Sequence, residues 1–250
     1  MAPYTGPKIM PLKLTLLALL LVSQAAASEL TYRSSPEQGT VLELYTSEGC
    51  SSCPPADRWF SGLVNHSTLW EGLYPLSFHV DYWDYLGWPD RLASPEAGDR
   101  QRRYRRQGSV NGVYTPGVLA TGEEWRSWRR NPSQLPASGR RVGVLELTTE
   151  GDAFEASFSP ADEAVKPLVL HVAILGFGMK TKVRAGENKG RELRHDFVVL
   201  GHSVFADGEQ RWRGKLPQAP LADEAERLAV VAWISAADRL GPIQAAGGWR

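Results

Sequence analysis

The chain has 250 residues, of which 42% are hydrophobic and 22% are charged. This length and composition are typical of a globular protein with one large domain or two small ones, and they exclude a collagen, a coiled coil and a disordered chain. The 28 basic residues balance the 28 acidic ones. Because no net positive charge would attract a polyanion, we expect no nucleic-acid partner.

The first 27 residues have the pattern of a secretory signal peptide. Lys8 and Lys13 precede a mainly apolar run over 14–22, and Ala25 and Ala27 have the A-x-A spacing of a cleavage site. The apolar run is much shorter than the roughly 20 residues that a membrane-spanning helix needs. We therefore expect cleavage near Ala27, a periplasmic or secreted mature protein, and no stable membrane insertion.

The next segment predicts a strand, a helix and a second strand. Residues 41–46 are strand-like, and an amphipathic stretch over 57–64 follows a turn that contains Cys50 and Cys53. A second apolar run over 74–80 completes a βαβ unit. The two strands of such a unit are expected to be parallel, with a right-handed connection.

The remainder of the first half is expected to hold two helices and a short strand. Residues 95–107 have helical composition with five arginines, and residues 122–130 predict a further helix. Between them a short strand has a proline at its start, and residues 131–140 have the composition of a linker.

Beyond Arg141, short apolar or alternating runs are separated by turn residues. That spacing predicts an all-β, sandwich-like module over 141–250.

Cys50 and Cys53 are the two cysteines of the sequence, and they lie three positions apart. A disulfide between them would close a loop too small to constrain the unfolded chain much, so the pair indicates chemistry rather than architecture. At the N-terminus of a helix the macrodipole stabilises a thiolate, and a second thiol one turn later can attack a mixed disulfide. We expect Cys50 to be the nucleophile and Cys53 to be the resolving thiol.

These motifs resemble a known fold. The strand, the CSSCP segment over 50–54, the helix that follows and the later Thr115-Pro116 pair are similar to the thioredoxin fold. The resemblance implies a cis bond before Pro116, beside the thiols. It also implies that the backbone of Thr115 pairs with an extended partner and that Pro116 shields the cysteines from metal capture.

Longer motifs are similar to an exported thioredoxin-like family, domain-of-unknown-function family 1223. The resemblance covers roughly residues 39–248 and rests on ELYTSEGCSSCPPAD, SFHVDYWDYLGWPD, VYTP and GENKGRELRH. It implies an α/β thioredoxin-like domain over 38–138, followed by the all-β module, and it implies no particular activity. Gly49 stands where thioredoxins have an aromatic residue, and Glu43 is one residue out of register with their buried aspartate. Since such an offset places a side chain on the opposite face of a sheet, no proton-relay role is transferred to Glu43.

Two other uses of the cysteines stay open. With His79 as a third ligand, Cys50 and Cys53 could bind copper or zinc and serve a metal carrier. The chain could also be a non-catalytic interaction module. His79, Asp81 and Asp84 are candidates for proton handling, although a histidine there is more often a packing or capping residue and the carboxylates could satisfy loop amides.

Aromatic residues and further histidines also call for interpretation. Tyr82, Trp83, Tyr85 and Trp88 either form a platform for a peptide or sugar or fill the seam between the two halves, and we favour the seam. His171, His195 and His202 are most simply ordinary strand residues.

The sequence thus predicts an exported thiol-disulfide oxidoreductase. Its expected partners are exported thiol or disulfide proteins, or a small thiol. No bound cofactor is expected, because the dithiol itself carries the two electrons. The direction of electron flow depends on the reduction potential, which the residues do not specify.

Overall fold

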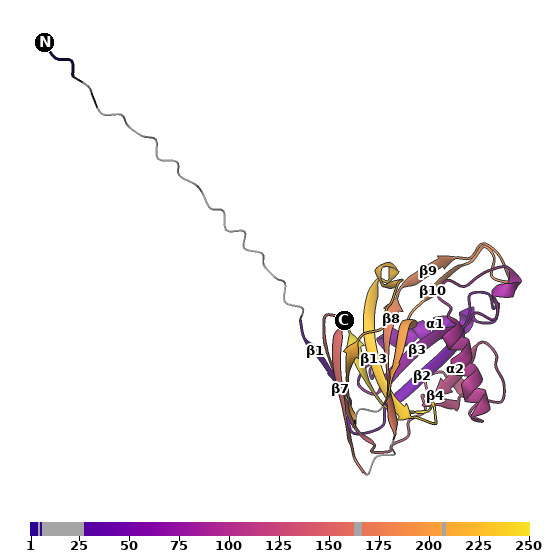
Figure 1. Ribbon diagram of the computed structural model, residues 1–250. Coiled ribbons are helices and arrows are strands. Elements are labelled where there is room, and N and C mark those ends of the chain that lie inside the picture. The colour runs from indigo at the N-terminus through magenta and orange to yellow at the C-terminus, as the bar shows by residue number, and fades with distance from the viewer. Residues whose placement is uncertain (5, 7–27, 163–166, 207–208) are drawn as a thin grey trace.

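The computed structural model describes residues 1–4, 6, 28–162, 167–206 and 209–250 (Figure 1). Most of the expected signal peptide over 1–27 lies outside the described residues. In the described part strands predominate, and the two α-helices are α1 (Pro54–Gly62) and α2 (Pro95–Arg106). Neither of these helices is long and apolar enough to cross a membrane.

The largest sheet has eight strands in the order β14-β13-β8-β11-β3-β2-β4-β5. The pair β2 and β3 is parallel, as the sequence predicts, with α1 connecting the two strands. The strands of this sheet are β2 (Thr40–Thr46), β3 (Leu73–His79), β4 (Gly117–Ala120), β5 (Glu123–Glu124), β8 (Leu168–Phe177), β11 (Val198–Phe205), β13 (Arg227–Ala236) and β14 (Pro242–Trp249).

A four-stranded sheet has the order β1-β6-β7-β12, and a separate hairpin pairs β10 with β9. The four-stranded sheet consists of β1 (Leu30–Arg33), β6 (Gly143–Glu150), β7 (Ala153–Pro160) and β12 (Arg211–Lys215), and the hairpin of β9 (Met179–Lys182) and β10 (Glu192–His195). Short 3-10 helices are η1 (Leu63–Asn65), η2 (Asp84–Leu86), η3 (Arg126–Arg129) and η4 (Ala222–Glu224). The helix expected over 122–130 is present only as the 3-10 helix η3, because the start of this segment forms β5.

The expected fold class, an α/β thioredoxin-like domain followed by a separate all-β module, is also wrong. The molecule is a strand-dominated, multi-sheet structure in which β8, β11, β13 and β14 continue the sheet that β2, β3 and β4 begin. The junction is β11, which lies parallel to β3; the carbonyl of Phe197, just before β11, accepts the Ser77 N–H at 2.8 Å. Because β3 is buried along its whole length, its second edge needs a partner strand for its backbone groups.

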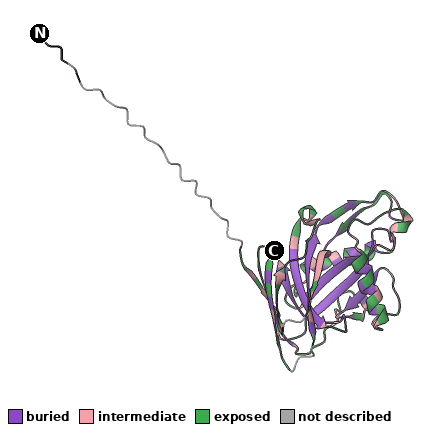
Figure 2. Ribbon diagram, in the orientation of Figure 1, coloured by how far each residue is buried: buried purple, intermediate pink, exposed green. Residues whose placement is uncertain are grey.

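The two faces of the large sheet pack against different partners. Most of its strands are buried, as their purple colour in Figure 2 shows. Leu170, Val172 and Ile174 of β8 pack with residues of the four-stranded sheet, such as Leu147. The intervening Ala173 and Leu175 instead belong to the core that contains β2, β3 and α1. This alternation follows from the two-residue period of a strand.

A buried ion pair fixes α2 on the large sheet. The Arg100 guanidinium donates from Nε to Glu43 Oε2 at 2.8 Å and from a terminal nitrogen to Oε1 at 2.9 Å. The Tyr104 hydroxyl donates to the same carboxylate at 2.6 Å. Glu43 thus serves the packing of α2, which agrees with not assigning it a role at the thiols.

Candidate functional site

Cys50 and Cys53 lie in the turn between β2 and α1. Cys53 immediately precedes α1, whose first turn contains two prolines. Its backbone N–H donates to the Cys50 carbonyl at 3.2 Å, so the turn brings the two residues together. Both thiols are free, and they are 1% and 0% exposed respectively.

The two thiols differ in acidity. A hydrogen bond from Cys53, supported by Ser52 and Thr115, lowers the pKa of Cys50 to about 6, although burial acts in the opposite direction. Burial raises the pKa of Cys53, and the hydrogen bond to Cys50 and the charge of Asp57 raise it further. These opposite shifts favour Cys50 over Cys53 as the thiolate at neutral pH.

Thr115 and Pro116 lie beside the nucleophile. The Thr115-Pro116 bond is cis, as the resemblance implied, and the Thr115 carbonyl oxygen lies 3.9 Å from Cys50 Sγ. Trp83 Nε1 donates to the Thr115 hydroxyl at 2.7 Å. The backbone and side chain of Thr115 are thus fixed next to the thiolate.

The three candidates for proton handling do not form one group. His79 at the end of β3 is buried, with Nδ1 2.7 Å from Asp90 Oδ2. Burial alone would lower the pKa of His79, but the adjacent Asp90 carboxylate raises it. Asp84 Oδ1 accepts the Asp90 backbone N–H at 3.0 Å, which is a loop-stabilising role, and Asp81 lies against Gly98 of α2.

No metal centre is formed around these residues in the part of the chain that the structure describes. Within that part, no group of three or more His, Cys, Asp or Glu side chains is arranged to hold a metal ion. His79, the suggested third ligand of Cys50 and Cys53, contacts Asp90 through Nδ1, and its Nε2 has no hydrogen-bond partner among the described residues.

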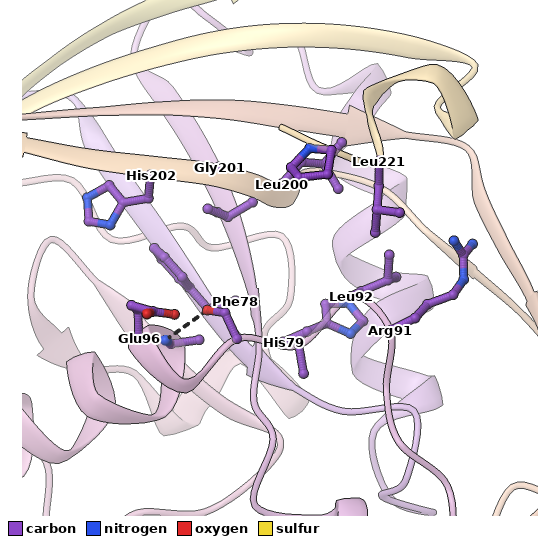
Figure 3. A pocket seen from close by; sticks show the side chains of 14 residues that line it. Phe78, His79, Arg91, Leu92, Glu96, Leu200, Gly201, His202 and Leu221 are labelled. Carbon is purple, nitrogen blue, oxygen red and sulfur yellow. Dashed lines mark hydrogen bonds between the residues drawn. The ribbon is translucent and has the colours of Figure 1, made fainter. Parts of the chain in front are cut away.

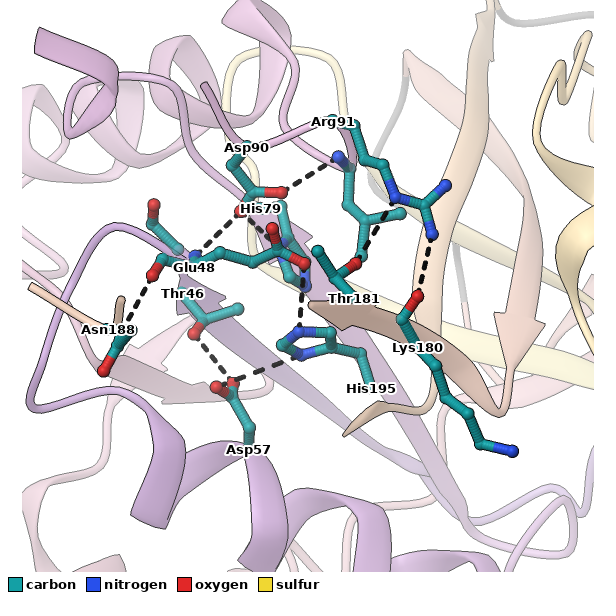
Figure 4. Close-up of polar contacts among 12 residues, drawn as sticks. Thr46, Glu48, Asp57, His79, Asp90, Arg91, Lys180, Thr181, Asn188 and His195 are labelled. Atoms are coloured by element: carbon teal, nitrogen blue, oxygen red, sulfur yellow. Dashed lines mark hydrogen bonds and ion pairs between the residues drawn. The ribbon is translucent and has the colours of Figure 1, made fainter. Parts of the chain in front are cut away.

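Five buried ionisable side chains form a polar cluster: Glu48, Asp57, His79, Asp90 and His195 (Figure 4). The His195 ring lies between two carboxyl groups, with Nε2 3.4 Å from Glu48 Oε1 and Nδ1 4.0 Å from Asp57 Oδ2. The rings of His79 and His195 meet edge to face, with centroids 4.7 Å apart. Five ionisable side chains are thus enclosed beside the thiol turn.

The sequence analysis missed Asp57 and His195. Asp57 stands four residues after Cys53 in the first turn of α1, and this helical spacing places the two side chains one turn apart. His195 belongs to β10 in the second half of the chain, where it was interpreted as an ordinary strand residue. Its presence in the GENKGRELRH motif was the available signal.

Two other residues of the same motif, Glu187 and Asn188, hold the backbone of the thiol turn. The buried Asn188 donates from Nδ2 to the carbonyl oxygens of Glu48 at 2.8 Å and Cys50 at 2.9 Å. The neighbouring Glu187 carboxylate accepts the Ser51 backbone N–H at 3.0 Å. The second half of the chain is thus part of the site.

The chain matches the family described as "Protein of unknown function (DUF1223)" over residues 41–235. It belongs to this family. No curated protein matches the sequence.

Two solved structures are similar to this DUF1223 protein. The crystal structure of protein AGR_C_4864 from Agrobacterium tumefaciens has 27% identity and a TM-score of 0.58, over 84% of this chain and 94% of that one. HBP35 of Porphyromonas gingivalis has 14% identity and a TM-score of 0.51, over 86% of this chain and 76% of that one. The second likeness concerns the fold alone.

The aromatic residues of the 82–88 loop have separate environments in this DUF1223 protein. Trp88 donates to Glu48 Oε2 at 2.9 Å and packs against Gly186, so it lies at the seam between the two halves, as favoured. Trp83 lies instead beside Thr115. Tyr85 is 79% exposed.

A cavity of about 550 Å³ lies between the end of β3, the 91–97 segment and β11 (Figure 3). Its lining includes Phe78, His79, Leu92, Glu96, Leu200 and His202. Neither cysteine lines it, and His79 belongs both to its lining and to the buried polar cluster.

Proposed function

We propose that this protein is a thiol-disulfide oxidoreductase in which Cys50 attacks and Cys53 resolves. The observation that carries the proposal is the pair of free thiols at the N-terminus of α1, with the Thr115 carbonyl beside Cys50; hydrogen bonding lowers the pKa of Cys50, whereas burial raises that of Cys53. This difference in acidity is what exchange chemistry requires, because the attacking sulfur must be a thiolate.

In the proposed reaction the Cys50 thiolate attacks one sulfur of a partner disulfide, and the other partner sulfur leaves as a thiolate. The Cys53 thiol then loses its proton and attacks Cys50 Sγ. A Cys50–Cys53 disulfide forms and the second partner sulfur is released. Two electrons pass from the dithiol to the partner, and the reverse sequence oxidises a partner dithiol. The chain needs no bound cofactor for this exchange.

The proposed partners are exported thiol or disulfide proteins, or a small thiol. Thr115 is the proposed contact for an extended partner, because its carbonyl lies 3.9 Å from Cys50 Sγ. Cys50 is only 1% exposed, whereas the adjacent Ser51 and Ser52 are on the surface. A partner therefore approaches from the side of the two serines. Because Cys50 is buried, the residues around its sulfur must move slightly before the partner can reach it.

Trapping of mixed disulfides tests this proposal. Cys53→Ser removes the resolving thiol, so we expect it to accumulate mixed disulfides through Cys50 that dithiothreitol releases. The matched variant Cys50→Ser is expected to trap none. Equal trapping by both variants, or none by Cys53→Ser with exported disulfide proteins or oxidised glutathione, would contradict the proposal.

We also propose that the protein is exported to the periplasm or secreted. The support is the charged, apolar and A-x-A pattern over 1–27. N-terminal sequencing of the protein recovered outside the cytoplasm is expected to begin at Ser28. A cytoplasmic protein that retains Met1 would contradict export.

A further inference from the structure

We infer that Trp83 is a positioning residue for the proposed exchange, because its indole N–H holds the Thr115 hydroxyl so that this hydroxyl donates to the Cys50 sulfur. The inference rests on the proposed thiol exchange and deepens it. It also explains Gly49, which stands where thioredoxins have an aromatic residue. In this chain the aromatic ring comes from the loop beyond β3 and acts through a hydrogen bond.

Trp83 lies against the residue that precedes the nucleophile. A Cβ atom at Gly49 would be 3.0 Å from Trp83 Cβ and 3.4 Å from the Trp83 carbonyl oxygen. The first of these distances is shorter than an ordinary contact between carbon atoms, so the loop packs this closely only because position 49 has no side chain. The absence of an aromatic residue before Cys50 and the presence of Trp83 beside it therefore belong to one arrangement.

The other end of the Trp83 side chain reaches Thr115. The indole Nε1 donates to the Thr115 hydroxyl oxygen at 2.7 Å. The carbonyl oxygen of the same threonine lies 3.9 Å from Cys50 Sγ. Trp83 therefore extends from the residue before Cys50 to the residue beside its sulfur, and it links the thiol turn with the segment before β4.

The loop beyond β3 also holds the segment before β4 at a second point. The Tyr82 hydroxyl donates to Gln101 Oε1 at 3.0 Å, and Gln101 Nε2 donates to the Tyr114 carbonyl at 2.7 Å. Gln101 is buried, so this link lies inside the protein. Because the backbone next to Thr115 is held in this way, the contact with Trp83 acts on the threonine side chain.

The chemistry of the two side chains determines the direction of their hydrogen bonds. An indole N–H can only donate, whereas a hydroxyl has one proton to donate and two lone pairs that accept. Because Trp83 occupies a lone pair of the Thr115 oxygen, the hydroxyl proton stays available for another acceptor. Hydrogen bonds from Cys53, Ser52 and the Thr115 side chain lower the pKa of Cys50, against the effect of burial. The Cys50 sulfur is thus the acceptor, and a donor directed at it favours its thiolate.

Hydrogen bonds, rather than charges, stabilise the Cys50 thiolate. The ionisable groups around the thiol turn are Cys53 itself, Tyr82 of the loop beyond β3, Asp57 and Arg58 of α1, and Glu187, Arg191 and Glu192 of the segment that leads into β10. Their charges are not among the main causes that shift the pKa of Cys50, which are hydrogen bonds and burial. Of the hydrogen-bond donors, Thr115 is the one that comes from outside the thiol turn, so its orientation depends on Trp83.

The pH profile of Cys50 alkylation by iodoacetamide tests the inference. Trp83→Phe keeps an aromatic ring and removes the N–H that holds Thr115. We expect the half-maximal rate to move about 0.5 to 1 pH unit upward, while the plateau rate at high pH stays within about twofold of the wild type. Trp59→Phe is the control, because Trp59 Nε1 donates to the Pro132 carbonyl instead, and it is expected to keep the wild-type profile.

A double-mutant cycle distinguishes a link through Thr115 from a general loosening of the loop. Thr115→Val removes the hydroxyl, and we expect a shift at least as large as that of Trp83→Phe. Since both changes act through the same hydroxyl, the combined variant should shift no further than Thr115→Val alone. Additive shifts in the combined variant would overturn the inference. So would Trp83→Phe with an unmoved midpoint, whether or not its rate is lower at every pH.

Thr115→Val is also the second variant, in case Trp83→Phe does not fold. An unmoved midpoint in Thr115→Val would show that the hydroxyl does not serve Cys50, and it would overturn the inference. Thr115→Ser keeps a hydroxyl and is expected to retain the wild-type midpoint. Alkylation requires no exchange, so these results are independent of mixed-disulfide trapping. A failure of trapping would contradict the proposed function, which is a different result.

Discussion

The side chain of Asn188 donates a hydrogen bond to the carbonyl oxygen of Cys50, 138 positions earlier in the chain, at a distance of 2.9 Å. The same amide nitrogen reaches the Glu48 carbonyl at 2.8 Å. The thiol turn is therefore held by a residue from the other half of the sequence. Its shape depends on the complete fold rather than on the βαβ unit alone.

We expect Asn188→Ala to lower the free energy of unfolding by about 1 to 3 kcal/mol, because two buried carbonyls lose their donor. Chemical denaturation of the reduced protein measures this change. The matched variant is Glu187→Gln, because the exposed Glu187 also contacts the thiol turn, and it is expected to have a much smaller effect. Equal effects of the two variants would show that Asn188 does not hold the turn as described.

The rate at which Cys50 reacts with iodoacetamide should follow its thiolate fraction. We expect a half-maximal rate near pH 6, because hydrogen bonding from Cys53 lowers the pKa of Cys50 to about 6 from the ordinary 9.0. Cys53→Ala removes the largest cause, so the half-maximal rate should move to higher pH. A half-maximal rate near pH 9 in both proteins would contradict the asymmetry between the thiols.

The pair of Glu43 and Arg100 is expected to be indispensable for stability. Arg100→Met leaves the Glu43 carboxylate buried without its cation, and we expect a loss of about 3 to 5 kcal/mol in the free energy of unfolding. Arg102→Met on the same helix breaks an exposed pair with Asp99 and is expected to cost about 1 kcal/mol or less. Combining Arg100→Met with Glu43→Leu should restore part of the loss, because no buried charge then remains.

His202 makes the stability of the protein depend on pH. Burial, together with the charge of Arg100, lowers the pKa of His202 to about 3 from 6.5. Between these values the unfolded chain binds more protons than the folded one. The contribution of His202 is therefore complete above about pH 6.5 and decreases as pH falls toward 3, by about 1.4 kcal/mol per pH unit.

Denaturation curves between pH 4 and pH 6.5 measure this dependence. We expect His202→Gln to have a shallower slope of unfolding free energy against pH than the wild type, whatever its stability at pH 7. The exposed Val204 lies on the same strand, and Val204→Thr should keep the wild-type slope. Identical slopes in all three proteins would show that His202 is not held in its neutral form.

Local structure around the cysteines could be predicted because its signals are local. The strand over 40–46, the helix that starts at Pro54 and the parallel strand over 73–79 follow from runs of apolar residues and from two prolines at a helix start. The place of Cys50 before a helix also led to the prediction that it is the nucleophile, and that role stays a prediction. The helix expected over 122–130 is present only as a 3-10 helix because the start of that segment pairs with β4.

Long-range pairing could not be predicted in the same way. The short apolar runs of the second half predicted several strands. The composition of β11, however, does not indicate that this strand pairs with β3 rather than with strands of a separate sandwich. His195 lies beside Glu48 and Asp57, and Asn188 bonds the carbonyls of the thiol turn, because the hairpin that precedes β11 lies over this turn. A polar residue in a strand is uninformative until its neighbours across the fold are known.

The reduction potential of the Cys50 and Cys53 pair tests the central proposal most directly. The mature protein would be equilibrated across a glutathione series, alkylated, and its free thiols counted by mass, with Cys53→Ser as the control that cannot form the internal disulfide. We expect a reversible two-electron couple between about −270 and −120 mV, the range of known exchange proteins. A disulfide that resists reduction until below about −300 mV, or thiols that never form a disulfide, would contradict a role in thiol-disulfide exchange.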